Sequence, residues 1–333
     1  MPNLDLKNTN NTAMNKVLWI ISFCVAIISV AVIALIFTSQ NKPKGLIADK
    51  KIAGIALSLS LPDKTAIVRP PVKSSDAKDP NILAKSALLI DIDSGYRMYE
   101  KNIQEKIPIA STTKIMTAIV VLENHLDSLE DTVTITYPMI AVESSDIKLQ
   151  VGEKISVNNL LKGLLIMSGN DTAYTLAGYF GGKEKFVEEM NTKARYLGLK
   201  NTAYKDPAGL DDEGLSTADD LAIVGTYAMR LEKFREIVKT TETTIASTDG
   251  RIIHDLKTSN HLLKTDDPYY YPNAYGIKTG FTYEAGHCLV SAATLNGHSI
   301  LSVILNTNED TIFASAKESR KLFDWGFNNW SWL

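Results

Sequence analysis

The chain has few cysteines and no excess of positive charge. Only Cys24 and Cys288 occur among its 333 residues, too few for a small fold held together by several disulfides. Lys and Arg total 35 against 38 Asp and Glu, a formal net charge of −3, so the chain has no basic field that would attract nucleic acid. Apolar residues make up 45% of the chain and charged residues 22%, a balance typical of folded rather than disordered proteins.

The apolar residues are unevenly distributed. Val17–Thr38 is a continuous stretch without a charged residue, and at about 1.5 Å per residue it is long enough to cross the roughly 30 Å core of a bilayer. We expect an uncleaved transmembrane anchor, with a cleaved signal peptide as the alternative. The predicted organisation is therefore a tail at 1–16, an anchor at 17–38, a Lys-, Pro- and Ser-containing linker at 39–81 and one folded domain at 82–333.

The folded domain has strand patterns at both ends and helical patterns between them. This order predicts an α+β fold in which both chain ends build one antiparallel sheet, flanked by helices, and the middle forms an inserted helical lobe. A cleft is expected where sheet and lobe meet. The predicted strands are 86–92, 96–101, 243–247, 251–256, 276–278, 286–294 and 298–305; the predicted helices are one opening at Ser111 and others at 157–167, 171–180, 183–197, 217–232 and 309–323.

Three short elements that could carry chemistry occur in order along this domain. They are Ser111-Thr-Thr-Lys114, Ser168-Gly-Asn170 and Lys278-Thr279-Gly280. Each is a weak signal alone, because Ser75-Lys78 and Ser145-Lys148 repeat the first spacing. Context favours Ser111, since it alone opens a buried helical pattern.

The spacing of Ser111 and Lys114 suits nucleophilic catalysis. Residues three apart share a helix face, so the Lys114 amine is expected beside the Ser111 hydroxyl. A lysine accepts the serine proton only when neutral, and apolar surroundings together with a second cation lower its pKa. Lys278 is the candidate for that cation.

The other two elements also have simpler structural explanations. Ser168 and Asn170 fit a turn and a helix N-cap, which would still leave side chains free to enter the cleft. Lys278–Gly280 fits the end of a strand, where a glycine often marks the close approach of another backbone. We expect that backbone to be a peptide-like substrate lying along the strand edge.

Together the elements resemble the serine active-site penicillin-binding proteins and β-lactamases. The wider segments 106–123, 160–177, 190–210 and 274–290 are similar to the low-molecular-mass D-alanyl-D-alanine carboxypeptidases related to penicillin-binding protein 5. This resemblance covers about residues 82–326 and implies a β-lactamase/transpeptidase-like fold. It further implies a serine peptidase that removes the terminal D-alanine from peptidoglycan stem peptides and binds β-lactam antibiotics covalently.

The resemblance also implies a role for each matching position. Ser111 would form the acyl-ester, Lys114 would accept its proton and Ser168 would relay a proton to the leaving amine. Asn170 would hold the substrate amide, while Lys278, Thr279 and Gly280 would bind the substrate and its terminal carboxylate. The backbone N–H groups of Ser111 and Phe281 would form the oxyanion hole.

Several alternatives remain open at this stage. A class A β-lactamase would need a carboxylate to activate the deacylating water, and no Glu-x-x-Leu-Asn lies between Ser168 and Lys278. A D,D-endopeptidase acting on cross-links would use the same residues, and a sensor of β-lactams or muropeptides would be acylated without turnover.

The resemblance also sets the expected location and partners. More lysines follow the apolar stretch than precede it, which by itself favours a cytoplasmic C-terminal side. The substrate lies outside the cell membrane, however, so we expect an extracytoplasmic domain on a single-pass anchor and a cytoplasmic tail. No metal is expected, because the histidines lack metal-ligand spacing. No organic cofactor or nucleic acid is expected either. The histidines are His125, His254, His261, His287 and His298.

Overall fold

The computed structural model describes residues 68–307, 309 and 311–332. The predicted anchor at 17–38 and Cys24 lie outside the described residues, and no helix within the described part is long and apolar enough to cross a bilayer. The compact unit begins at Val68, earlier than the predicted boundary at residue 82. Its first strand pairs with the last one, and the Trp325 indole donates to the Lys78 carbonyl at 2.7 Å.

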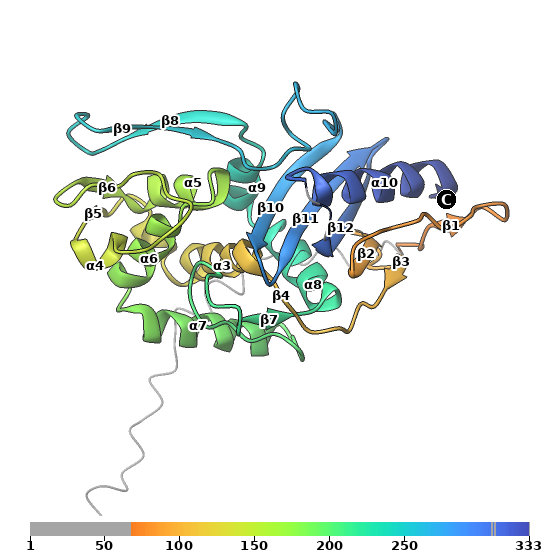
Figure 1. Ribbon diagram of the computed structural model, residues 1–333, viewed down its shortest axis with the longest axis horizontal. Coiled ribbons are helices and arrows are strands. Elements are labelled where there is room, and N and C mark those ends of the chain that lie inside the picture. The colour runs from red at the N-terminus through yellow and green to blue at the C-terminus, as the bar shows by residue number, and fades with distance from the viewer. Residues whose placement is uncertain (1–67, 308, 310, 333) are drawn as a thin grey trace, which may run out of the picture. The chain divides into compact units, whose positions relative to one another are not determined.

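The central sheet is antiparallel and is built from both ends of the domain, as predicted (Figure 1). Its strand order is β10-β11-β12-β2-β3, so the strand that carries Lys278 lies at one edge. The three interior strands β11, β12 and β2 are buried along most of their length because helices cover both faces. The strands are β2 (Ser86–Asp91), β3 (Arg97–Lys101), β10 (Ala274–Thr282), β11 (Gly286–Leu295) and β12 (His298–Thr307).

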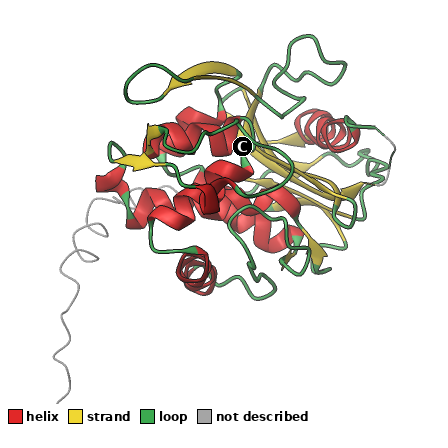
Figure 2. Ribbon diagram, turned by 60° about the vertical axis from the view of Figure 1, so that its left-hand side comes forward, coloured by secondary structure: helices red, strands yellow, loops and turns green. Residues whose placement is uncertain are grey.

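Two helices cover the two faces of this sheet (Figures 1 and 2). Helix α10 (Ala314–Asn329) packs on β11 and β12 through a cluster that includes Phe323 and Trp325, and α8 (Ala218–Ala228) packs on β12 and β2. Gly225 of α8 meets Leu301 and Val290, leaving no room for a side chain. This close packing joins the sheet to the largest hydrophobic core of the described chain.

The helical lobe is inserted between the two halves of the sheet, as the order of patterns predicts. At its centre is α3 (Lys114–Asn124), whose residues are buried from Lys114 through Leu122. It is surrounded by helices because an apolar helix without a polar face must be covered on all sides. The lobe also contains η1 (Ala110–Thr113), η2 (Leu126–Ser128), α4 (Tyr137–Ile140), α5 (Val157–Ile166), α6 (Asn170–Tyr179), α7 (Lys183–Tyr196) and α9 (Glu232–Val238).

Four two-stranded sheets tie loops to this framework. One of them, the hairpin β8–β9, lies along the lobe beside α5 and β6 (Figure 1). The pairs are β1 (Val72–Lys73) with β13 (Trp330–Ser331), β4 (Ile107–Pro108) with β7 (Leu215–Ser216), β5 (Thr132–Thr134) with β6 (Lys154–Ser156), and β8 (Glu242–Ala246) with β9 (Ile253–Lys257).

Several predicted boundaries of helices and strands were wrong. Ser111 lies in the 3₁₀ turn η1, and the α-helix itself begins at Lys114. The helix predicted at 217–232 ends earlier, as α8, at Ala228, and α9 (Glu232–Val238) was not predicted. The last helix begins later and ends later than 309–323. The β2–β3 connection is longer than the three residues predicted, because β3 begins at Arg97.

Other residues show how local sequence sets a helix start, a tight turn and core positions. The Thr217 hydroxyl accepts from the Asp220 N–H and so caps α8. Asn296 and Gly297 join β11 to β12 with φ values of 52° and 85°, the left-handed conformation that a tight hairpin turn requires. Cys288 is buried in β11, and Trp325 packs into a core cluster.

Candidate active site

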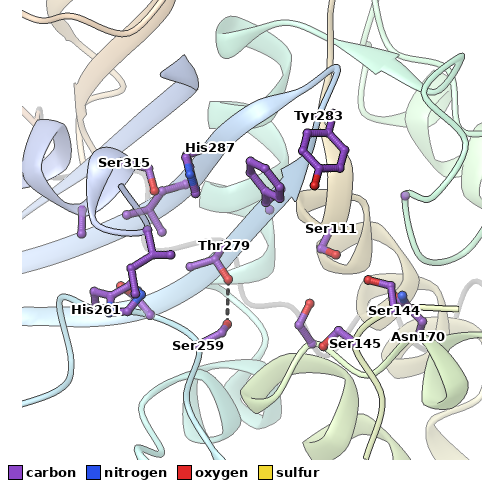
Figure 3. Close-up of a pocket in the computed structure, with 18 of the residues that line it drawn as sticks. Ser111, Ser144, Ser145, Asn170, Ser259, His261, Thr279, Tyr283, His287 and Ser315 are labelled. Carbon is purple, nitrogen blue, oxygen red and sulfur yellow. Dashed lines mark hydrogen bonds between the residues drawn. The ribbon is translucent and has the colours of Figure 1, made fainter. Parts of the chain in front are cut away.

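All three sequence elements meet at one cavity between the sheet edge and the helical lobe. Its volume is about 760 Å³, within the roughly 300–1,000 Å³ range of small-molecule sites. Ser111, Ser168, Asn170, Thr279, Gly280 and Phe281 line it. Figure 3 shows Ser111 and Asn170 on one side of the cavity, across from Thr279.

The backbone around Ser111 is held by two glycines from distant parts of the chain. A Cβ on Gly280 would stand 3.0 Å from both the Ile109 carbonyl and the Ser111 N, and one on Gly209 would stand 1.9 Å from the Ala110 carbonyl. Ala110 itself has φ 45°, a conformation that residues with a side chain rarely adopt. The absence of a side chain at Gly280 therefore admits the turn that carries Ser111, and Gly280 also lines the cavity.

Lys114 is fully buried and is held by three oxygen acceptors. Its Nζ donates to Ser111 Oγ at 2.8 Å, to Asn170 Oδ1 at 2.7 Å and to the Ala208 carbonyl at 2.9 Å. Burial lowers the pKa of Lys114 well below its usual value, and the nearby charge of Lys278 lowers it further. Both causes are those predicted from the sequence, and both favour the neutral amine that a general base requires.

The loop that supplies the Ala208 carbonyl is itself organised by one carboxylate. Asp206 is buried and accepts from the backbone N–H groups of Ala208, Gly209 and Asp211 at 2.6 to 2.8 Å. These bonds fix both the acceptor for Lys114 and the glycine that packs beneath Ala110.

Asn170 opens α6 and connects this helix to Lys114. Its Oδ1 accepts from Lys114 and its Nδ2 donates to the Glu143 carbonyl at 3.0 Å. The predicted capping role is wrong, since the N-cap of α6 is Gly169 and no side chain caps it. Ser168 is 7% exposed, has φ 68° and lines the cavity.

The sheet side of the cavity is formed by β10. Lys278 is 1% exposed, and its Nζ donates to the Thr279 carbonyl at 3.0 Å. Burial lowers the pKa of Lys278 to about 7. The Thr279 hydroxyl lies 2.6 Å from Ser259 Oγ, and both hydroxyls face the cavity (Figure 3).

Sequence reasoning missed several residues of the cavity. Ser144 and Ser145 form the wall beside Asn170, while His261, His287 and Ser315 lie beyond Thr279 from Ser111 (Figure 3). Apart from the chance spacing of Ser145 and Lys148, no motif marks these positions, because folding alone brings their segments to the cleft. The described residues contain no cluster of His, Cys, Asp or Glu arranged to hold a metal ion.

Comparison with known proteins identifies the family. Residues 73–309 match the family model described as D-alanyl-D-alanine carboxypeptidase, peptidase S11. The chain belongs to this family. The match extends over the sheet, the helical lobe and all three sequence elements.

Individual family members are similar over most of this chain. D-alanyl-D-alanine carboxypeptidase DacF of Bacillus subtilis is 35% identical over 74% of this chain, and the chain spans 63% of DacF. A D-alanyl-D-alanine endopeptidase of Pseudomonas aeruginosa is also 35% identical, over 82% of this chain and 87% of its own length.

A solved structure of the family has the same fold. The Streptomyces K15 DD-transpeptidase superposes with a TM-score of 0.69 at 34% identity, covering 75% of this chain and 99% of that one. The architecture is therefore the α+β fold of the penicillin-binding DD-peptidases, as predicted.

Proposed function

We propose that this chain is a serine-type D-alanyl-D-alanine carboxypeptidase that removes the terminal D-alanine from peptidoglycan stem pentapeptides. The observation that carries the proposal is the 2.8 Å hydrogen bond between Ser111 Oγ and a fully buried Lys114 whose pKa is lowered. A serine hydroxyl next to a neutral amine is an activated nucleophile for acyl transfer.

The first step of the proposed reaction is acylation of the serine. Ser111 Oγ attacks the carbonyl carbon between the last two D-alanine residues, while its proton passes to the neutral Lys114 Nζ. The carbonyl oxygen becomes an oxyanion that the backbone N–H groups of Ser111 and Phe281 stabilise. A fixed donor of this kind contributes about 2.7–4 kcal/mol of barrier lowering.

The second step releases D-alanine and then the shortened peptide. The C–N bond breaks as the proton that Lys114 took from Ser111 passes through Ser168 to the leaving amine, which leaves a neutral Lys114 and the peptide esterified to Ser111. Water then attacks the ester carbon, and Lys114 takes the water proton and returns one to Ser111 Oγ. Asn170 holds the substrate amide, while Lys278 and Thr279 bind the terminal carboxylate above Gly280.

β-Lactams follow the same first step. Attack by Ser111 opens the lactam ring and leaves a covalent adduct. The chain contains no Glu-x-x-Leu-Asn between Ser168 and Lys278 to activate a deacylating water, so we expect the adduct to be released slowly.

The test combines intact mass with product analysis. Wild-type protein should gain the mass of one penicillin and release D-alanine from a pentapeptide, and Ser111→Ala should do neither. An adduct that persists in Ser111→Ala would refute the nucleophile. Ser75→Ala is the matched control, because Ser75 has the same spacing to a lysine but is exposed outside the cavity. An adduct without D-alanine release would instead favour a sensor.

The cavity also favours a second candidate function, a D,D-endopeptidase acting on cross-linked peptides. The cavity continues beyond Thr279 to His261, His287 and Ser315, on the side where a leaving group bound to Thr279 would extend. This part of the cavity offers room for a leaving group larger than a single D-alanine. The similar Pseudomonas protein is named an endopeptidase.

Two peptides that share the same acyl half distinguish these functions. One ends in D-alanine, and in the other a D-lysine that carries a dipeptide on its side chain replaces this D-alanine. A carboxypeptidase should cleave the first with at least tenfold higher kcat/KM, whereas an endopeptidase should cleave the second as fast or faster. Ser315→Phe should lower cleavage of the second peptide selectively, because the ring would fill the far end of the cavity.

We also propose that residues 17–38 anchor the protein in the cell membrane with the peptidase domain on the extracytoplasmic side. The uncharged length of this segment and the location of the peptidoglycan substrate support the proposal. Externally added protease should digest a C-terminal tag on intact protoplasts. Protection of the tag, or its release from membranes by high salt, would contradict it.

A further inference from the structure

A buried pair outside the cavity holds one of the cavity walls. His254 lies on β9 and Glu153 directly precedes β6, and His254 Nε2 is 2.7 Å from Glu153 Oε1. The side chains are only 3% and 0% exposed. His254 Nδ1 is 2.8 Å from the Ile147 carbonyl. Both ring nitrogens thus face oxygen acceptors, and the ring makes both bonds as a donor when it is the imidazolium.

Both members of the pair bind the same loop, residues 143–152, which we call the wall loop. His254 binds the Ile147 carbonyl, and Glu153 Oε2 accepts from the Gln150 N–H at 3.0 Å. The wall loop contains no helix or strand. Two of its residues, Ser144 and Lys148, have φ values of 75° and 67°, so it keeps this conformation only where outside groups hold it.

The wall loop contacts the catalytic groups through Asn170. The Ser145 carbonyl accepts from the Asn170 backbone N–H at 2.7 Å, and the Glu143 carbonyl accepts from Asn170 Nδ2 at 3.0 Å. Because the amide nitrogen is bound to Glu143, the amide oxygen points to Lys114, where it accepts at 2.7 Å. The wall loop therefore determines which end of the Asn170 amide meets the lysine.

Asp171 holds the wall loop from the other side. Its carboxylate accepts from the backbone N–H groups of Ile147 and Leu149 at 3.1 to 3.2 Å. Ile147 is thus bound through its N–H by α6 and through its carbonyl by the β8–β9 hairpin. Asp171 is next to Asn170 in sequence, whereas His254 and Glu153 lie outside the cavity lining.

We infer that His254 and Glu153 are positioning residues for acyl transfer: they hold the wall loop so that Asn170 presents its oxygen to Lys114. The inference rests on the proposed function, since it concerns the acylation of Ser111. It also gives the β8–β9 hairpin a role in the reaction, although neither strand reaches the cavity.

The decisive variant removes both members of the pair. His254→Leu alone would leave the buried Oε1 of Glu153 without its His254 partner, but His254→Leu with Glu153→Met replaces two buried polar groups with apolar ones of similar volume. Such exchanges often leave stability unchanged. We expect a melting temperature close to that of wild type and a tenfold or greater loss in the rate at which penicillin acylates Ser111.

The rescue variant is Glu153→Gln with His254 retained. The amide oxygen of Gln accepts from the Gln150 N–H, and its NH2 donates to Nε2 of a neutral His254 whose Nδ1–H donates to the Ile147 carbonyl. Both contacts to the wall loop are kept, so acylation should stay within threefold of wild type. If the pair had only a structural role, the acylation rate would fall in proportion to the melting temperature across all variants. Lys114 and Ser111 are unchanged throughout.

The matched control is the other His–Glu pair in the described part of the chain, His125 and Glu189. His125 Nε2 is 3.4 Å from Glu189 Oε2, away from the wall loop and the cavity. His125→Leu with Glu189→Met should acylate like wild type. Equal losses in the two double variants, or no loss in the first, would overturn the inference. Absence of any adduct in wild type would instead refute the proposed function.

Discussion

The two sides of the cleft hold their lysines in different ways. On the helical side, Lys114 Nζ donates to three oxygens that come from η1, α6 and the loop at Ala208. On the sheet side, Lys278 Nζ donates, within the described chain, only to its neighbour Thr279. Because fixed oxygens hold its Nζ beside Ser111 Oγ, the neutral Lys114 amine is placed to accept the Ser111 proton. A lysine without such bonds keeps its charge available for an incoming carboxylate.

The pKa of both lysines is lowered. Burial lowers the pKa of Lys114 well below its usual value, and the charge of Lys278 lowers it further, which favours the neutral amine. Burial lowers the pKa of Lys278 to about 7, so Lys278 is partly charged at neutral pH. The four predictions below test this division between proton transfer and substrate binding.

The largest expected effect is on the helical side. Lys114→Met removes the general base, so we expect a loss of about 10³-fold in the acylation rate, within the range of general base catalysis. Lys278→Met should cost less and should act mainly on KM for the pentapeptide. Both variants should remain folded, because each replaces a buried amine with an apolar chain of similar length. Stopped-flow acylation and steady-state kinetics measure the two effects, and equal losses would contradict the division.

The next largest effect is expected where β10 contacts the turn that carries Ser111. Gly280→Ala places a Cβ 3.0 Å from the Ile109 carbonyl and the Ser111 N, which we expect to cost about 1–3 kcal/mol of unfolding free energy and to slow acylation. Denaturant unfolding monitors the stability.

The control for this substitution is Gly178→Ala in α6. There the new Cβ would meet only the flexible Met139 side chain, at 3.2 Å, and alanine favours a helix. Similar destabilisation at both positions would show that the approach of β10 to the Ser111 turn is not tight.

The third effect is the pH dependence of kcat/KM. Lys278 loses its proton as the pH rises through about 7, so carboxylate binding should weaken above that pH by up to about tenfold per pH unit. Lys114 must be neutral, so activity should also fall at low pH as it becomes protonated. The expected profile is a bell, and Lys278→Arg should remove its alkaline limb. A limb that persists in this variant would assign it to another group.

The smallest effect is expected from the hydroxyl pair on the sheet side. Ser259→Ala removes the hydroxyl 2.6 Å from Thr279 Oγ1, and one such hydrogen bond contributes about 0.5–1.5 kcal/mol. We expect KM for the pentapeptide to rise severalfold and kcat to change little. Thr279→Ser keeps both hydroxyls and should behave like wild type, whereas a fall in kcat alone would assign Ser259 to the chemical step.

Much of the fold followed from local pattern. The strands at both domain ends and the buried helix after Ser111 were predicted because short apolar runs bounded by turn residues, and a helical pattern that is apolar almost all round, are local signals. Helix boundaries were less accurate: the pattern at 217–232 predicts one helix, yet α8 ends at Ala228 and α9, which begins at Glu232, was not predicted. Termination there depends on packing as much as on residue type.

The candidate site also contains residues that the sequence predicts and residues that it does not. Ser111, Lys114, Ser168, Asn170, Lys278 and Thr279 carry their signal in short motifs, and the predicted lowering of the Lys114 pKa followed from two of them. Neither Ser145 nor His254 has such a signal. Ser145 borders the cavity and His254 binds the wall loop only because folding brings together residues more than 100 positions apart. The contact between His254 and Ile147 is an example.

The sequence by itself determined which chemical groups are present, since a serine and a lysine on one helical turn are adjacent whatever the rest of the chain does. Only the tertiary structure decided that Lys114 is fully buried, that Lys278 lies near enough to lower its pKa, and that Gly280 admits the Ser111 turn. The physical reason is the separation in sequence of the groups that interact. Hydrogen bonding within one turn is local, whereas burial and charge interaction depend on segments that only folding brings together.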